Sequence, residues 1–263
     1  MALSKIDRQF WPAIVAHRGA SATHPENTLS SFLAAALAGA DMVELDVRLT
    51  ADGVPVVLHD LDVSRTTDGS GSVHLMTLKE IKALDATGGR GPRAEIPTLQ
   101  EVLEALSGRV AVDLEIKNLP GEPSFDSPRE TIVLETLRLI EETRFDGIVL
   151  VSSFNWLSIE RAKEQSPDLP TGLITTAAVD PWAALVYVRG NGHDLLLPQA
   201  SALVAAGEAF LDAAHADGIR IGSWTVDEPE AVERLFAMGV DAIATNDPAM
   251  AVPIRDRFRA RAS

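Results

Sequence analysis

The sequence predicts an α/β protein of the closed (β/α)8 barrel class. Eight short segments of strand character recur along the chain, and a helical segment follows each of them. The length of 263 residues matches the roughly 250 that such a barrel needs. No GxGxxG or GxxxxGKS/T phosphate loop occurs, which disfavours an open doubly wound sheet. We therefore predict one domain over residues 1–263.

The expected strands are short, mostly apolar runs. They lie at 14–17, 42–47, 110–117, 147–152, 171–174, 194–197, 219–226 and 240–245. The first helix is expected to begin with Asn27 or Thr28 as its N-cap and to stop at Gly39. The later helices are expected at 98–107, 128–142, 156–165, 181–189, 201–216 and 228–238, with a closing helix after the last strand. Because each strand precedes a helix, parallel strands are expected.

One stretch, 43–60, indicates a β-hairpin. Apolar and polar residues alternate on both sides of Asp52-Gly53, a dipeptide typical of two-residue hairpin turns. With these two residues in the turn, Asp46 would lie opposite His59. Glu44 precedes Asp46 by two positions, so both carboxylates leave the strand on the same face. The hairpin is therefore expected to gather two carboxylates and an imidazole.

Residues 61–96 interrupt the regular alternation. They are rich in glycine and hold only one brief helical stretch, expected at 77–84. This composition is typical of a segment inserted after the second strand. We expect it to lie over the pocket rather than to form a core layer.

Composition and charge exclude several classes of partner. The net charge of −15 argues against nucleic acid or an anionic membrane as a partner. No run approaches 18 apolar residues, so no membrane span is expected, and the N-terminus lacks the pattern of a signal peptide. A cytoplasmic location is the expectation. The basic stretch 255–261 indicates a solvated helix end, with a homo-oligomer contact as the alternative.

Three carboxylates are expected at the ends of neighbouring strands. In a barrel of this class the active site lies at the carboxyl ends of the strands, where Glu44, Asp46 and Glu115 would converge. Oxygen ligands without cysteine favour a hard divalent cation, Mg²⁺ or Ca²⁺. The alternative is an ion-pair network of these acids with Arg18 and Lys117. Asp113, on the same strand as Glu115, is expected to support the site rather than bind the ion.

Two histidines are expected to flank this acidic cluster. His17 ends the first strand, and His59 arrives from the hairpin. Two imidazoles at one site suit a general base and a general acid. Arg18, next to His17, offers a planar fork for a phosphate group.

Six motifs in order resemble the glycerophosphodiester phosphodiesterase family. They are HRGASATHPENT, VELDVRLTADGVPVVLHD, DLEIK, SSF, SWTVD and TNDP. The resemblance implies a TIM barrel with an insertion at about 61–96 and a divalent ion on Glu44, Asp46 and Glu115. The family reaction converts a glycerophosphodiester and water to sn-glycerol 3-phosphate and an alcohol, through attack of the glycerol 2-hydroxyl on phosphorus.

The resemblance also implies roles for other residues. It makes His17 and His59 the acid/base pair, has Arg18 and Lys117 hold the phosphate, and puts Trp224 in the pocket wall near the glycerol. This chain departs from the family at Asp227, where asparagine is common.

Three other functions are compatible with parts of the pattern. A glycosidase with paired carboxylates would leave both histidines and the metal-like triad unexplained. A phosphate binder without catalysis would have no use for two histidines. A phospholipase- or sphingomyelinase-like phosphodiesterase on a related barrel is the nearest alternative, although no amphipathic membrane-binding stretch supports it.

Overall fold

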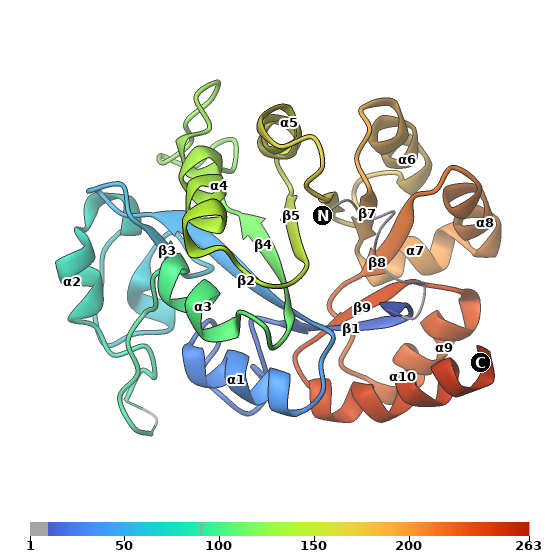
Figure 1. Ribbon diagram of the computed structural model, residues 1–263, viewed down its shortest axis with the longest axis horizontal. Coiled ribbons are helices and arrows are strands. Elements are labelled where there is room, and N and C mark those ends of the chain that lie inside the picture. The colour runs from blue at the N-terminus through green and yellow to red at the C-terminus, as the bar shows by residue number, and fades with distance from the viewer. Residues whose placement is uncertain (1–9, 90, 263) are drawn as a thin grey trace.

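The computed structural model describes residues 10–89 and 91–262. Within them the strands of a parallel barrel pair in the order β1-β9-β8-β7-β6-β5-β4-β2, and a β1–β2 pairing closes it. These strands are β1 Ala13–His17, β2 Met42–Leu49, β4 Ala111–Ile116, β5 Val149–Ser153, β6 Thr171–Thr175, β7 Leu195–Pro198, β8 Arg220–Ser223 and β9 Ala242–Thr245. The predicted (β/α)8 barrel is confirmed (Figure 1).

Helices alternate with these strands around the outside of the barrel (Figure 1). They are α1 Leu29–Leu37, α3 Leu99–Leu106, α4 Thr131–Thr143, α5 Trp156–Gln165, α6 Pro181–Gly190, α7 Ala200–Ala206, α8 Glu208–Ala216, α9 Pro229–Met238 and α10 Pro248–Ala262. The single helix expected at 201–216 is in fact two. Gly207 separates α7 from α8 with φ +77° and ψ −176°, a conformation that no helix contains.

The barrel interior changes character from one end to the other. At the amino ends of the strands Val15, Met42, Ala111 and Leu150 form a buried apolar layer. Side chains alternate faces along a strand, so the next inward positions on β1, β2 and β4 are His17, Glu44 and Asp113. The apolar layer closes the bottom of the barrel and leaves polar residues at the carboxyl ends.

The hairpin register differs from the prediction by one residue. β3, Pro55–Val57, pairs antiparallel with β2, and Leu58 rather than His59 donates its backbone N–H to the Asp46 carbonyl. The turn takes three residues because Thr50 pairs with Val54 and Gly53 adopts φ +76°. His59 reaches the site nonetheless, because it follows the end of β3 and is not held to the alternation of the strand.

The inserted segment lies beside β2 and β3 rather than over the barrel. It contains two short 3-10 helices, η3 Val63–Arg65 and η4 Val73–Leu75, and helix α2 Leu78–Lys82 (left in Figure 1). Its buried apolar residues pack with two from the hairpin, forming a small core of their own: Val56, Leu58, Val63, Val73, Ile81, Ala86 and Ile96. None of its described residues lines the central cavity, so the lining does not support the expectation that it covers the pocket.

The basic C-terminal stretch is paired within the chain. Arg255 is 6% exposed and contacts Asp41, which Arg259 also contacts. Arg257 pairs with Glu233 of α9. The expectation of a solvated helix end is therefore wrong for Arg255, whereas Arg257, whose side chain is 50% exposed, agrees with it. Among residues 10–89 and 91–262, the helices lack the combination of length and hydrophobicity that a membrane span requires.

Gly19, which follows His17 and Arg18, is expected to tolerate no side chain. Its φ is +81°, and a Cβ would lie 2.3 Å from the hydroxyl oxygen of the buried Ser31. We predict that Gly19→Ala lowers the free energy of unfolding by about 2–4 kcal/mol, from backbone strain plus the clash. Urea unfolding measures this loss. Gly53→Ala is the control, because Gly53 has φ +76° with open space around it, and a loss as large there would contradict the clash.

Candidate active site

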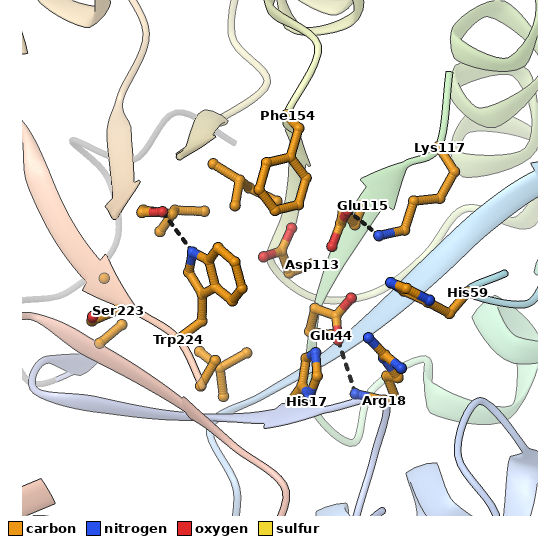
Figure 2. Close-up of a pocket in the computed structure, with 16 residues that line it drawn as sticks. His17, Arg18, Glu44, His59, Asp113, Glu115, Lys117, Phe154, Ser223 and Trp224 are labelled. Carbon is orange, nitrogen blue, oxygen red and sulfur yellow. Dashed lines mark hydrogen bonds and ion pairs between the residues drawn. The ribbon is translucent and has the colours of Figure 1, made fainter. Parts of the chain in front are cut away.

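A cavity of about 270 Å³ opens at the carboxyl ends of the barrel strands (Figure 2). Polar residues that the motifs predicted line one side of the cavity, and apolar residues line the other. The lining residues are Val15, His17, Arg18, Glu44, His59, Asp113, Glu115, Lys117, Phe154, Ile174, Leu197, Gly222, Ser223, Trp224, Ala242 and Ala244. Asp46 is fully buried beside Glu44 and Glu115. The structure therefore brings all eight predicted site residues together.

Glu44, Asp46 and Glu115 form one acidic cluster. Each offers an oxygen atom that lies within 4.8 Å of the other two. Glu44 Oε1 is buried and has no hydrogen-bond partner among the described residues, while Glu44 Oε2 accepts the backbone N–H of Arg18 at 2.8 Å. Burial and then Asp46 and Glu115 raise the pKa of Glu44. An oxygen cluster with an unsatisfied buried atom fits a hard divalent cation.

Two cations contact the same cluster, as the ion-pair alternative requires. Lys117 Nζ lies 2.9 Å from Asp46 Oδ1 and also pairs with Glu115, and Arg18 Nε lies 3.3 Å from Asp46 Oδ2. Against burial, these cations lower the pKa of Asp46. Two positive charges face three carboxylates, and Glu44 makes no side-chain ion pair among the described contacts. The ion-pair network therefore neutralises the cluster only in part.

Asp113 supports this arrangement from the cavity floor. It is 6% exposed and accepts a hydrogen bond from the Ser152 hydroxyl at 2.7 Å. Burial raises its pKa to about 7. It is not part of the acidic cluster, so its position agrees with a supporting role.

His17 is held in one tautomer by a chain of hydrogen bonds. Asp227 accepts the side-chain N–H of Asn246 at 2.6 Å, which turns the amide oxygen of Asn246 toward His17. That oxygen lies 2.8 Å from His17 Nδ1 and also accepts the Ser21 hydroxyl. Nδ1 therefore carries the hydrogen and Nε2 is left for chemistry. Burial and the neighbouring Arg18 lower the pKa of His17.

His59 is oriented in the same way by its own neighbour. Its Nδ1 lies 2.6 Å from Asp60 Oδ1, and a carboxylate can only accept there, so Nε2 is again left free. The Arg48 side chain donates to the His59 backbone carbonyl at 2.8 Å. Burial lowers the pKa of His59. In Figure 2 the guanidinium of Arg18 lies between the two imidazoles.

Asn27 is a site residue that sequence reasoning treated mainly as a helix start. Thr28 is the N-cap of α1, and its hydroxyl accepts the backbone N–H of Ser31. Asn27 is 2% exposed and donates its side-chain N–H to Asp46 Oδ2 at 2.7 Å. Its φ of +56° turns the chain so that the amide points inward. The sequence analysis did not identify Asp60 and Asn246 as orienting residues. Only their position beside other motif residues could have indicated this role.

The other wall of the cavity is apolar and aromatic. The rings of Phe154 and Trp224 meet edge to face with centroids 5.4 Å apart. Trp224 Nε1 donates to the Leu197 carbonyl at 2.9 Å, which holds the indole in place. Figure 2 shows this wall opposite the charged residues. The cavity therefore has one face that can bind an anionic group and one that can pack against the C–H groups of a ligand.

The barrel, the acidic cluster and the paired imidazoles define an enzyme of the phosphoric diester hydrolase class. Residues 17–250 match the glycerophosphoryl diester phosphodiesterase family. A glycerophosphodiester phosphodiesterase of Caldanaerobacter subterraneus subsp. tengcongensis is 37% identical over 89% of this chain and 94% of its own length. One from Bacillus altitudinis is 32% identical over 94% and 99%. The chain belongs to the glycerophosphoryl diester phosphodiesterase family.

Solved structures support the same placement. A phosphodiesterase of Oleispira antarctica, in complex with the product sn-glycerol-3-phosphate, superposes with a TM-score of 0.84 at 30% identity. The superposition covers 94% of this chain and 98% of that one. A glycerophosphodiester phosphodiesterase of Thermotoga maritima has a TM-score of 0.75 at 27% identity, over 92% and 98%. The resemblance inferred from the motifs is confirmed.

Proposed function

We propose that this protein hydrolyses glycerophosphodiesters to sn-glycerol 3-phosphate and an alcohol with the help of a divalent cation. One observation carries the proposal: the acidic cluster and both histidines meet in one cavity that also has an apolar wall. The product bound by the Oleispira antarctica phosphodiesterase has matching chemistry, because sn-glycerol-3-phosphate joins an anionic phosphate to a glycerol whose C–H groups can pack on an aromatic wall. The whole chain acts as one barrel domain, with residues 61–96 as an insertion at its side.

Glu44, Asp46 and Glu115 are the residues that would hold Mg²⁺ or Ca²⁺. When bound, the cation supplies positive charge that stabilises the phosphate oxygens during displacement at phosphorus. Asn27 donates to Asp46 and so limits which of its oxygens are free. Lys117 stays charged, because Asp46 and Glu115 raise its pKa against the effect of burial.

Arg18 and Lys117 would hold the phosphate, and Trp224 would contact the glycerol carbons. Both cations line the cavity beside the acidic cluster, which an anionic substrate could not otherwise approach. The net charge of −15 makes such local positive charge necessary. The aromatic wall lies across the cavity and fits the apolar part of the glycerol.

His17 and His59 would divide the proton transfers. The glycerol 2-hydroxyl loses its proton to one imidazole and forms a bond to phosphorus, while the bond from phosphorus to the alcohol oxygen breaks. The other imidazole gives its proton to that oxygen. Water then opens the cyclic phosphate by the reverse transfers. Each histidine has its Nδ1 occupied by an acceptor, so each exchanges protons at Nε2.

A substrate panel with and without chelator tests this function. The purified chain should release sn-glycerol 3-phosphate from glycerophosphodiesters, and removal of divalent ions should abolish the release. Turnover that survives complete removal of divalent ions would overturn the metal assignment. Cleavage of sphingomyelin or intact phospholipids in preference to the deacylated diesters would favour the alternative phosphodiesterases. The panel also measures which alcohol and which ion are preferred.

A further inference from the structure

One residue of the inserted segment connects the two sides of the site. Arg65 Nε lies 2.5 Å from Asp60 Oδ2, and Asp60 holds His59. The other guanidinium nitrogens of Arg65 donate to both oxygens of Glu26, at 2.8 and 2.7 Å. Glu26 Oε1 in turn accepts from Arg18 NH1 at 2.9 Å. A continuous chain of charged groups therefore leads from one catalytic imidazole to the arginine of the phosphate site.

The Asp60 end of this chain determines how His59 is presented. Arg65 contacts both oxygens of the carboxylate, with Nε at Oδ2 and NH2 3.3 Å from Oδ1, the oxygen that also binds His59. Although partial burial opposes it, Arg65 and His59 lower the pKa of Asp60 to about 2. An ionised carboxylate held at both oxygens has one orientation, and the imidazole bound to it shares that orientation.

The Glu26 end determines how Arg18 is presented. Glu26 binds NH1 of Arg18, while Asp46 lies 3.3 Å from its Nε. Because Arg65 holds both oxygens of Glu26, that carboxylate cannot turn away from Arg18. Arg65 itself does not line the cavity. The contacts by which Arg65 reaches the site are therefore its hydrogen bonds to the two carboxylates.

The inserted segment holds Arg65 in place. Arg65 ends η3, whose N-cap Asp62 accepts the backbone N–H of Ser64. Val63, in the same short helix, is fully buried in the apolar core of the insertion. The Arg65 side chain is 47% exposed, so its ion pairs contribute little to stability. These ion pairs instead fix the orientation of the Asp60 and Glu26 carboxylates.

We propose that Arg65 is a positioning residue that couples the inserted segment to His59 and Arg18 through Asp60 and Glu26. This inference rests on the proposed function, in which His59 transfers a proton and Arg18 holds the phosphate. It gives the insertion a role in turnover although none of its described residues lines the cavity.

Arg65→Met tests the proposal, because methionine keeps much of the side-chain bulk and removes every donor. We expect kcat to fall about 10–100-fold, the usual loss when a group that orients an active residue is removed. The affinity for Mg²⁺ and the melting temperature should stay near those of the wild type. Arg65→Lys should recover only part of the loss, because one ammonium cannot bridge two carboxylates as a planar fork does.

Arg138→Met is the matched control. The Arg138 side chain is also 47% exposed and also pairs with two carboxylates, Glu135 and Glu142, on the outer face of α4. It should leave kcat unchanged. A loss in Arg65→Met no larger than in Arg138→Met, or a loss that follows a fall in melting temperature, would overturn the inference. A wild-type chain inactive on every diester in the same assay would instead overturn the proposed function.

A double-mutant comparison locates the path. If Arg65 acts through Asp60, adding Arg65→Met to Asp60→Asn should cost much less than Arg65→Met alone costs the wild type. The same should hold for Glu26→Gln. If the loss from Arg65→Met added fully to the loss from Asp60→Asn and to the loss from Glu26→Gln, Arg65 would not act through either carboxylate.

Discussion

His17→Ala and His59→Ala are each expected to lose about 10²–10⁴-fold in turnover, or about 3–5 kcal/mol of transition-state stabilisation. Each imidazole has Nδ1 bound by an acceptor, Asn246 for His17 and Asp60 for His59. In the proposed mechanism both would therefore exchange protons at the other nitrogen. Cation affinity should remain nearly intact, because neither histidine belongs to the acidic cluster. Steady-state kinetics beside a cation titration separates the two effects.

The double variant sharpens this prediction. Removing both histidines should cost less than the product of the two single losses, because groups that act as a unit are not additive. His24→Ala is the control, since His24 is exposed and its side chain bonds only to the neighbouring Thr23 among the described contacts. Full activity of either single variant would refute the acid/base assignment and leave the metal site untouched.

Removal of one carboxylate from the acidic cluster is expected to weaken cation binding at least about 100-fold, with turnover falling alongside. Glu44→Gln, Asp46→Asn and Glu115→Gln keep the shape of each side chain and remove its charge. Calorimetric titration with Mg²⁺ and Ca²⁺ measures the affinity directly, without relying on activity. If Glu115→Gln bound both ions as the wild type does, Glu115 would not be a ligand.

The same variants should differ in stability when no cation is present. Glu44 has a buried oxygen without a described partner, next to two other acids. Glu44→Gln removes the repulsion between the Glu44 carboxylate and the carboxylates of Asp46 and Glu115. It should therefore raise the melting temperature of the cation-free protein. Asp46→Asn should lower it, because Lys117 and Arg18 lose their shared partner.

A buried carboxylate away from the site is the control for these variants. Glu130 is 2% exposed and accepts the Ser158 hydroxyl at 2.7 Å. Glu130→Gln is expected to leave cation affinity unchanged, whatever it does to the melting temperature. Equal affinity losses in Glu130→Gln and Glu44→Gln would show that the losses come from general loosening of the fold.

The residues of the site could be predicted because they lie at the ends of strands. Alternating strands and helices determine a parallel barrel, and a parallel barrel brings the carboxyl ends of all its strands to one face. His17, Glu44 and Glu115 therefore meet although 98 positions separate the first from the last. Their convergence follows from order and periodicity alone. Their roles remain predictions until the variants are measured.

Predictions from local sequence preference were incomplete at the hairpin turn and at the start of the first helix, where two conformations compete. Asp52-Gly53 suits a two-residue turn, but the chain uses three residues with Gly53 left-handed, and the register shifts by one. Asn27 and Thr28 are both good N-caps, and only the contact of Asn27 with Asp46 separates their roles. In each case the two local conformations have similar intrinsic energy, so contacts with the rest of the barrel decide between them.

The amino-acid sequence by itself determined the barrel, the order of its elements and which side chains reach the mouth. Periodicity and strand order carry that information from one end of the chain to the other. Only the tertiary structure decided which groups orient those side chains: Asn246 for His17, Asp60 for His59, and Arg65 for Glu26. Arg65 and Glu26 are 39 positions apart. Arg65 ends the short helix η3 and Glu26 lies in a turn, and the paths of such segments follow from packing rather than from any repeat.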